Sequence, residues 1–158
     1  MDRVDASLVA LRRILRATDL FGRELAQSVG LTAAQFRVLQ IVAETGQCTA
    51  TTISQRMRIS QATVTSLVDK LVRQDMVRRE KSQTDRRQTN IMITARGNQA
   101  IEKAPDPLQQ RFVEKFGALD DWEQAALIAA LERVAAMLDA EDLDAAPVLD
   151  TRGSLAPS

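Results

Sequence analysis

Apolar residues recur at steps of three and four over most of this chain, a spacing that predicts helices with one buried face. The first such stretch covers residues 5–28 and is followed by Gly30, and the second covers residues 33–44 and is followed by Gly46. Thr32 stands before the second stretch and is a favourable N-cap residue. The chain is therefore expected to begin with two helices, each ended by a glycine.

Residues 49–74 predict two shorter helices joined by a tight turn. The first covers residues 49–57, a connection of two residues follows, and Ser60 caps the second, which extends to about Gln74. Two helices across so short a turn form a helix-turn-helix unit, whose second helix enters the major groove of DNA.

The pattern then changes to alternation, which predicts a β-hairpin. One strand starts at Met76, and residues 88–94 return as the second strand, in which we expect the row of Ile91 and Ile93 to face the core. The tip between the strands, residues 81–87, is entirely polar or charged. A hairpin directly after a helix-turn-helix makes the unit a winged helix.

Three more helices are expected after the hairpin, again from the spacing of apolar side chains. They cover residues 94–104, 108–116 and 121–138, and Pro105 and Pro107 interrupt the path between the first two. Acidic residues, Pro, Gly and Ser then accumulate, so we expect residues 141–158 to form a flexible tail. The predicted fold class is mainly α, a winged helix-turn-helix with a two-stranded β-wing and flanking N- and C-terminal helices.

The charges of the chain are unevenly distributed, although 21 Lys and Arg balance 21 Asp and Glu. Residues 49–103 carry 11 basic and 5 acidic side chains, whereas residues 104–158 carry 4 basic and 11 acidic ones. A basic segment that coincides with a helix-turn-helix is typical of a surface that faces DNA phosphates.

An enzyme is not expected, because the residues that most often perform acid–base catalysis are missing. The sequence contains no His and no Tyr, and its six glycines are scattered singly, without a phosphate-binding loop. We expect neither a cofactor nor a metal. A single cysteine suits a reducing compartment, and no apolar run is long enough to cross a bilayer. We therefore expect a cytoplasmic protein without a membrane partner.

The second helix of the helix-turn-helix carries the residues that would face DNA bases. If Val64, Leu67, Val68 and Leu71 face inward, the leading end of the helix presents small polar residues on the opposite side. Gln can bond adenine, Ser and Thr can bond several bases, and Ala or a Thr methyl can meet the thymine methyl. The alternative is that these are merely small surface residues of a stable helix. The candidates are Gln61, Ala62, Thr63, Thr65 and Ser66.

Basic residues around this helix suggest two further kinds of DNA contact. Arg86 and Arg87 at the wing tip suit a narrow minor groove, where negative potential is concentrated. Asp85 could hold one of their guanidinium groups by a bidentate pair, or it could be an ordinary turn aspartate beside two exposed arginines. Long, widely spaced cations are better assigned to phosphates, namely Lys70, Arg73, Arg78, Arg79 and Lys81.

These residues carry a resemblance to a known family. Three segments carry it: Leu31-Thr-Ala-Ala-Gln-Phe-Arg-Val-Leu39, Ser60-Gln-Ala-Thr-Val-Thr-Ser-Leu-Val-Asp-Lys-Leu71 and Thr84-Asp-Arg-Arg-Gln-Thr-Asn-Ile-Met-Ile-Thr-Ala-Arg-Gly97. Through them the chain resembles the MarR family of bacterial transcription regulators over about residues 5–140. The resemblance implies a homodimer, built by the N- and C-terminal helices, on a palindromic operator. It places the wing-tip arginine at Arg87, the orienting aspartate at Asp85, and the recognition positions at Ser60 through Ser66 and Lys70.

The helices outside the winged unit are expected to mediate dimerisation. We expect a single domain over residues 1–158, with dimerisation helices in residues 1–30 and 104–140 around a DNA-binding unit at 32–103. The alternative is that their apolar residues pack on their own subunit. The predicted dimerisation residues are Leu8, Leu11, Leu15, Phe112, Leu127, Leu131, Val134 and Leu138.

The sequence departs from two sensor types within the family. The family's peroxide sensors use a cysteine in the first helix with tyrosine partners, whereas Cys48 lies just before the helix-turn-helix and no Tyr is present. The zinc sensors need histidines, which are absent. We therefore interpret Cys48 as a small half-buried residue, with intermolecular oxidation as the alternative. Residues 104–112 resemble a subgroup associated with compatible-solute genes.

Our hypothesis from the sequence is a sequence-specific, ligand-responsive repressor with three partners: operator DNA, a second copy of the chain and a small-molecule effector. The competing interpretation is a ligand-independent winged helix that packages DNA or binds protein. The sequence leaves the effector, the operator, the target genes and the choice between repression and activation open.

Overall fold

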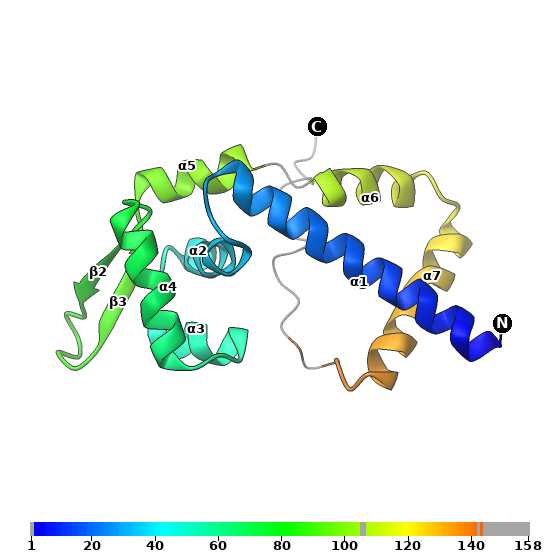
Figure 1. Ribbon diagram of the computed structural model, residues 1–158, viewed down its shortest axis with the longest axis horizontal. Coiled ribbons are helices and arrows are strands. Elements are labelled where there is room, and N and C mark those ends of the chain that lie inside the picture. The colour runs from blue at the N-terminus through cyan, green and yellow to red at the C-terminus, as the bar shows by residue number, and fades with distance from the viewer. Residues whose placement is uncertain (1, 105–106, 142, 144–158) are drawn as a thin grey trace. The chain divides into compact units, whose positions relative to one another are not determined.

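The computed structural model describes residues 2–104, 107–141 and 143 (Figure 1). The described residues divide into two compact units, one ending with helix α5 and one beginning with helix α6. The first unit contains α1 (Arg3–Ser28), α2 (Ala33–Thr45), β1 (Gln47–Thr49), α3 (Ala50–Met57), α4 (Gln61–Arg73), β2 (Val77–Lys81), β3 (Thr89–Ile93) and α5 (Ala95–Lys103). The second contains α6 (Pro107–Gly117) and α7 (Asp121–Met137).

The mainly helical class and the positions of the helices agree with the predictions from hydrophobic spacing. The largest difference at a helix start is in α1, which begins two residues earlier than expected because Asp2 caps it and accepts a hydrogen bond from the Val4 amide at 3.4 Å. Thr32 caps α2 as predicted, in a reciprocal arrangement with the side chain of Gln35. The predicted break at Pro105, and the predicted tail at 142 and 144–158, lie outside the described residues.

The wing belongs to a three-stranded sheet, so the prediction of a two-stranded wing was incomplete. The antiparallel order is β1-β3-β2, with Cys48 opposite Ile91 and Arg79 opposite Ile91 on the other side. β1 has only three residues between two helices, which is too short for a period-two pattern to be recognised. Its consequence is that the hairpin is anchored along one side to the chain that enters α3.

The hydrophobic core of the first unit forms around α2, which contacts α1, α4, α5 and the sheet. Leu25 and Ala26, at the end of α1, pack into this core, and Ile91 is buried as predicted. Ile93 is half-buried and packs against the same cluster. The largest fully buried side chains are Leu39, Ile41, Ile53, Leu71, Val38, Val42, Val64, Val68 and Val77.

The turn between α3 and α4 is fixed by local hydrogen bonds. Arg58 adopts a left-handed conformation with φ of 54°, which ends α3. The Ser54 hydroxyl donates to the Ile59 carbonyl at 2.6 Å, and the Ile59 amide donates to the Ser54 carbonyl at 3.2 Å. This tight connection brings the chain directly to Ser60, the N-cap of α4.

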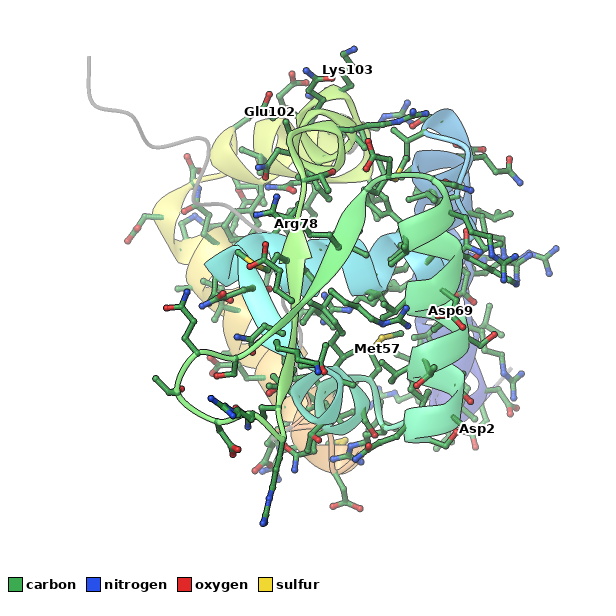
Figure 2. The ribbon with its side chains drawn as sticks, turned by 90° about the vertical axis from the view of Figure 1, so that its left-hand side faces the viewer. Asp2, Met57, Asp69, Arg78, Glu102 and Lys103 are labelled. Carbon is green, nitrogen blue, oxygen red and sulfur yellow. The ribbon has the colours of Figure 1, made fainter. Side chains whose placement is uncertain are left out.

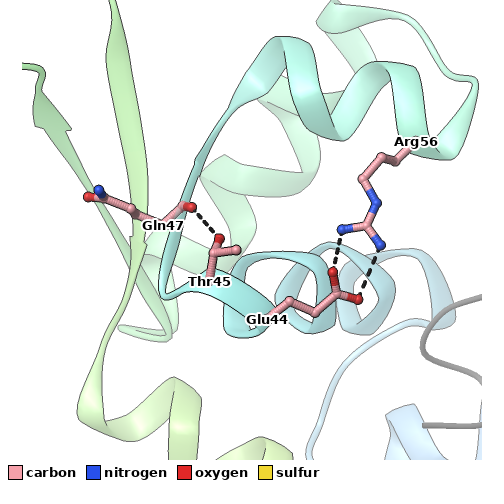
Figure 3. A network of polar contacts seen from close by, with 4 residues as sticks. All are labelled: Glu44, Thr45, Gln47 and Arg56. Atoms are coloured by element: carbon pink, nitrogen blue, oxygen red, sulfur yellow. Dashed lines mark hydrogen bonds and ion pairs between the residues drawn. The ribbon is translucent and has the colours of Figure 1, made fainter.

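Two polar contacts hold the end of α2 to the elements that follow it (Figure 3). Arg56 of α3 donates two hydrogen bonds to the Glu44 carboxylate, at 2.6 and 3.1 Å. The Thr45 hydroxyl donates to the Gln47 carbonyl at 2.6 Å. Because the Arg56–Glu44 pair is partly exposed, we expect it to orient α3 more than to stabilise the fold.

The wing and α5 meet at a very close contact beside Gly97. Thr94 caps α5 by accepting the Gly97 amide at 3.0 Å, and its hydroxyl donates to the Asp75 carbonyl at 2.6 Å. The Thr94 amide donates to the Met76 carbonyl at 3.1 Å. A Cβ added at Gly97 would collide with that carbonyl oxygen, so no side chain fits there.

The second unit is a helical pair with little buried apolar surface of its own. The rings of Phe112 and Phe116 stack on α6, with 5.4 Å between their centroids. Gln124 of α7 donates to the carbonyls of Phe116 and Leu119, at 2.9 and 3.2 Å, and so ties the two helices together. None of the residues of α7 is buried. No helix in the described part of the chain is long and apolar enough to cross a membrane.

We expect Gly97→Ala to destabilise the protein by about 1–3 kcal/mol, because the added methyl group must displace backbone rather than a flexible side chain. The measurement is urea denaturation followed by circular dichroism at one protein concentration.

Gly22→Ala is the matched control for that variant. Gly22 lies inside α1 and nothing stands within 4 Å of the position of its missing Cβ. There the substitution should be neutral or should raise the free energy of unfolding by about 0.5–1 kcal/mol. Equal stability of the Gly97→Ala variant and the unsubstituted protein would contradict the close contact at Met76.

Candidate nucleic-acid interface

Helix α4 has one buried face and one exposed face. Val64, Val68 and Leu71 are buried and Leu67 is half-buried, as the spacing predicted. The side chains proposed to face DNA are all exposed, namely Ser60, Gln61, Ala62, Thr63, Thr65, Ser66 and Lys70. The packing therefore leaves the predicted surface open to solvent.

The polar groups at the leading end of α4 are largely bonded within the protein. The Ser60 hydroxyl accepts the Thr63 amide at 3.1 Å and lies 2.8 Å from the Thr63 hydroxyl. The Thr65 hydroxyl donates to the Gln61 carbonyl at 3.0 Å, and the Gln61 amide nitrogen lies 3.4 Å from the Thr51 hydroxyl. Ser60 thus has a structural role as the N-cap in addition to any contact with DNA.

Two of the cations assigned to phosphates are paired with carboxylates in this structure. The Arg78 side chain lies 3.0 Å from Glu80 on the same strand. Arg79 lies 2.6 Å from Asp69 of α4 and also reaches the Thr65 carbonyl at 3.5 Å. Figure 2 shows Asp69 on α4 and Arg78 on the wing. In this structure the guanidinium of Arg79 joins the wing to the recognition helix, and its assignment to phosphate remains a prediction.

A cavity of about 320 Å³ lies beside this ion pair, between α4 and the sheet. Apolar side chains of α4 and β3 form part of its wall, and the Asp69–Arg79 pair forms another part. Its lining residues are Ala50, Thr65, Val68, Asp69, Arg79, Thr89 and Ile91. The Asp69–Arg79 ion pair thus adds a polar link between the recognition helix and the wing, beside a cleft that is open to solvent, to the apolar contacts that Val68 and Ile91 make in the core.

The wing tip is organised around Ser82, one of the polar residues of the predicted tip. Ser82 is only 9% exposed, and its hydroxyl accepts the amides of Thr84 and Asp85, both at 3.3 Å. Its own amide donates to the Gln88 carbonyl at 2.9 Å. Lys81 is exposed and belongs to β2, so the loop begins one residue later than predicted.

Asp85 shapes the turn instead of holding a guanidinium group. Its carboxylate accepts the backbone amide of Arg87 at 3.0 Å, and its carbonyl accepts the Gln88 amide at 3.0 Å. The bidentate pair considered above is not formed among the described residues, and the contact seen is that of a turn aspartate. Arg86 and Arg87 are exposed, and neither forms an ion pair with the described residues.

The environment of Cys48 agrees with its interpretation as a structural residue. It is half-buried in β1. Burial raises the pKa of its thiol from 9.0 to about 11, against a smaller lowering by Arg56 and a further small rise from Glu44. A neutral thiol is a poor nucleophile, so this environment disfavours reaction of Cys48 at neutral pH. Among the described residues, no group of three or more His, Cys, Asp or Glu is arranged to hold a metal ion.

Most residues predicted to mediate dimerisation are exposed within the chain. Leu8 and Leu15 of α1 are exposed and Leu11 is half-buried. Phe112 of α6 is exposed, as are four residues of the last helical segment: Leu127, Leu131, Val134 and Leu138. Large apolar side chains at helical spacing without cover are unusual on a monomer.

Comparison with known proteins agrees with this arrangement. The model of the MarR family matches residues 29–88, which span α2, α3, α4 and most of the wing. Over these residues the chain is similar to the MarR family. An uncharacterized HTH-type transcriptional regulator of Bacillus subtilis, YsmB, is 29% identical over 116 residues, which cover 73% of this chain and 80% of that protein.

Solved structures of the family share the fold. A MarR family protein from Bacillus stearothermophilus is 26% identical, with a TM-score of 0.67 over 88% of this chain and 99% of that chain. BpsR of Bordetella bronchiseptica, whose DNA binding is regulated by 6-hydroxynicotinic acid, is 25% identical, with a TM-score of 0.60 over 85% of this chain and 95% of that chain.

The similarity to this family and to named transcriptional regulators supports the general activity. MarR family proteins are transcriptional regulators that bind DNA through a winged helix-turn-helix and are not enzymes. This chain is therefore a DNA-binding transcription regulator.

We expect Asp69→Asn to weaken specific DNA binding and to strengthen binding to random duplex. The substitution releases Arg79, so the wing loses its link to α4 while one more cation becomes available to phosphates. The salt dependence on random duplex should steepen by about one unit of slope. Fluorescence anisotropy over a range of salt concentrations measures both effects.

Glu80→Gln is the matched control, because it removes the same charge from the same region without touching the link between wing and helix. It should strengthen binding to both DNAs. If both variants behave alike on specific DNA, the Asp69–Arg79 pair acts only through its charge.

Proposed function

We propose that this regulator is a cytoplasmic, homodimeric, ligand-responsive repressor that binds a palindromic operator in double-stranded DNA. The proposal rests on one observation: the chain has an exposed surface on α4 and the wing, here called the reading surface, and also exposed rows of apolar side chains outside it. The reading surface supports recognition of one half-site. The apolar rows support a second copy that recognises the other.

The reading surface would use α4 in the major groove and the wing tip in the minor groove. The exposed leading turns of α4 would meet base edges, and Lys70, Arg78 and Lys81 would meet phosphates. Arg86 and Arg87 are free to enter a narrow minor groove, and Asp85 contributes by holding the turn that presents them.

Dimerisation follows from the apolar side chains that the chain leaves uncovered. Leu15 is 56% exposed, Leu131 50% and Leu138 54%. Covering such residues with a second copy removes apolar area from water at about 25 cal/mol per Å². A twofold dimer would also place two recognition helices about 34–36 Å apart, one helical turn of DNA.

Ligand response is supported by the similarity to BpsR, whose DNA binding is regulated by a small molecule. An effector would act by binding more tightly to a dimer conformation with one distance between the two recognition helices than to a conformation with another distance. Its influence is limited to the difference between those two affinities. Repression follows where the operator overlaps a promoter.

Selection of bound fragments from genomic DNA, followed by footprinting, tests the proposal as a whole. A repressor should protect a twofold-symmetric site and prefer it to scrambled sequence by roughly 10³ or more. A packaging factor would bind all fragments with similar affinity. Retention of a protein partner but of no DNA would point instead to an interaction module.

We expect Leu131→Glu to convert the dimer to monomer at micromolar concentration, because a carboxylate cannot be buried in an apolar interface without a partner. Sedimentation velocity measures the change, and circular dichroism checks that the helices remain. Val72→Glu is the control, since Val72 is an exposed apolar residue on α4 outside the proposed interface. An unsubstituted chain that sediments as a monomer would refute the dimer.

We expect Arg87→Ala to weaken binding to operator and to random duplex alike, and to lower the salt slope by about one unit. Arg133→Ala removes an equal charge from α7 and should change neither value. An unchanged salt slope for Arg87→Ala would remove this residue from the DNA contacts.

A further inference from the structure

Most polar side chains at the start of α4 are hydrogen-bonded within the protein. Four of its five candidate base-reading residues carry polar side chains, and all five are exposed. A hydroxyl group has one hydrogen to donate, so a hydroxyl that is bonded internally contributes less to base recognition. The hydrogen bonds at the start of α4 therefore decide which atoms remain for DNA.

The hydroxyls of both threonines are engaged within the protein. Thr65 donates its hydrogen to the Gln61 carbonyl at 3.0 Å, and the Thr63 oxygen lies 2.8 Å from the Ser60 hydroxyl. An exposed threonine whose hydroxyl is bonded in this way retains its Cγ2 methyl group for contact with DNA. With the methyl group of Ala62, three methyl groups then lie on the leading turns of α4.

Strong polar readers are scarce on the same turns. Residues 61–68 contain no Arg, Lys or Asn, so the commonest contact with guanine cannot come from them. The amide nitrogen of Gln61 is directed to the Thr51 hydroxyl at 3.4 Å. Ser66 is the exception, since its hydroxyl makes no hydrogen bond within the described part of the chain.

We propose that α4 recognises thymine through its C5-methyl group, by apolar contact with Ala62 and the methyl groups of Thr63 and Thr65. In unmodified DNA only thymine carries a methyl group at this position of the major groove, and Ala and Thr methyl groups are suited to contact it. The inference rests on the proposed function, because it requires α4 to lie in the major groove of a specific site. It assigns A·T pairs to the positions beneath the first two turns.

The test removes only the thymine methyl. Two random-sequence duplex libraries of one design, synthesised with thymidine or with deoxyuridine, are each selected with the full-length protein. The best duplex from the thymidine library is then prepared with single thymines replaced by uracil. We expect each contacted thymine to lose about fourfold in affinity, the factor for one methylene removed from water. Binding to unselected duplex should not change.

A protein variant removes the methyl group that would contact thymine, and it is measured on the same thymine and uracil duplexes. Thr65→Ser keeps the hydroxyl that bonds to the Gln61 carbonyl and loses only Cγ2. It should bind the thymine duplex about fourfold more weakly and the matching uracil duplex unchanged. Thr18→Ser is the control, because Thr18 of α1 makes the same bond, to the Ile14 carbonyl at 3.0 Å. It should leave the ratio between thymine and uracil duplexes as it is.

Two outcomes would overturn the inference, and they are distinguishable. If the selected duplex is preferred over scrambled sequence but every uracil form binds equally well, thymine methyl groups are not read and the proposed function stands. If neither library yields a duplex preferred over scrambled sequence, the proposed function fails together with the inference.

Discussion

The rotation of α4 about its own axis is the constraint on which the reading surface depends. Val64, Val68 and Leu71 are buried against the core around α2, and each buried apolar side chain contributes about 1.5–3 kcal/mol. The polar contacts on the outer face contribute about 1 kcal/mol each, so packing decides the orientation. Once the inner row is buried, helical geometry leaves Ala62 and Ser66 no direction but outward.

The wing has a comparable constraint at its root. Gly97 lets α5 approach the Met76 carbonyl, where the wing begins, and Thr94 closes the same junction by two side-chain hydrogen bonds. This gives a physical meaning to the Thr-x-x-Gly sequence at the end of the second wing strand. A second link, from Arg79 to Asp69, fixes the wing against α4, so the two DNA-reading elements cannot move independently without breaking an ion pair.

The sequence was sufficient for features that repeat over several helical turns. Helices, the helix-turn-helix and the buried row of α4 all extend over enough residues for a period to appear. The sequence was insufficient where a single side chain could form a hydrogen bond or ion pair with several different neighbours. The pairing of Arg79 depends on a distance across the folded chain. Ser82 and Asp85 bond to backbone amides two or three residues away, contacts that the spacing of apolar residues does not reveal. The strand β1 was missed for a third reason, its length of three residues.

The ion pairs of Arg78 and Arg79 change how the affinity for DNA should be divided between α4 and the wing. Residues 49–103 carry 11 cations, but Asp69 and Glu80 neutralise two of those nearest the recognition helix. The exposed cations left without an ion pair in the described wing are Lys81, Arg86 and Arg87. Because phosphate contacts supply affinity without sequence information, these three cations would contribute salt-dependent binding without reading the sequence. The methyl-rich start of α4 adds no charge, so it can discriminate between sequences without also strengthening binding to random DNA.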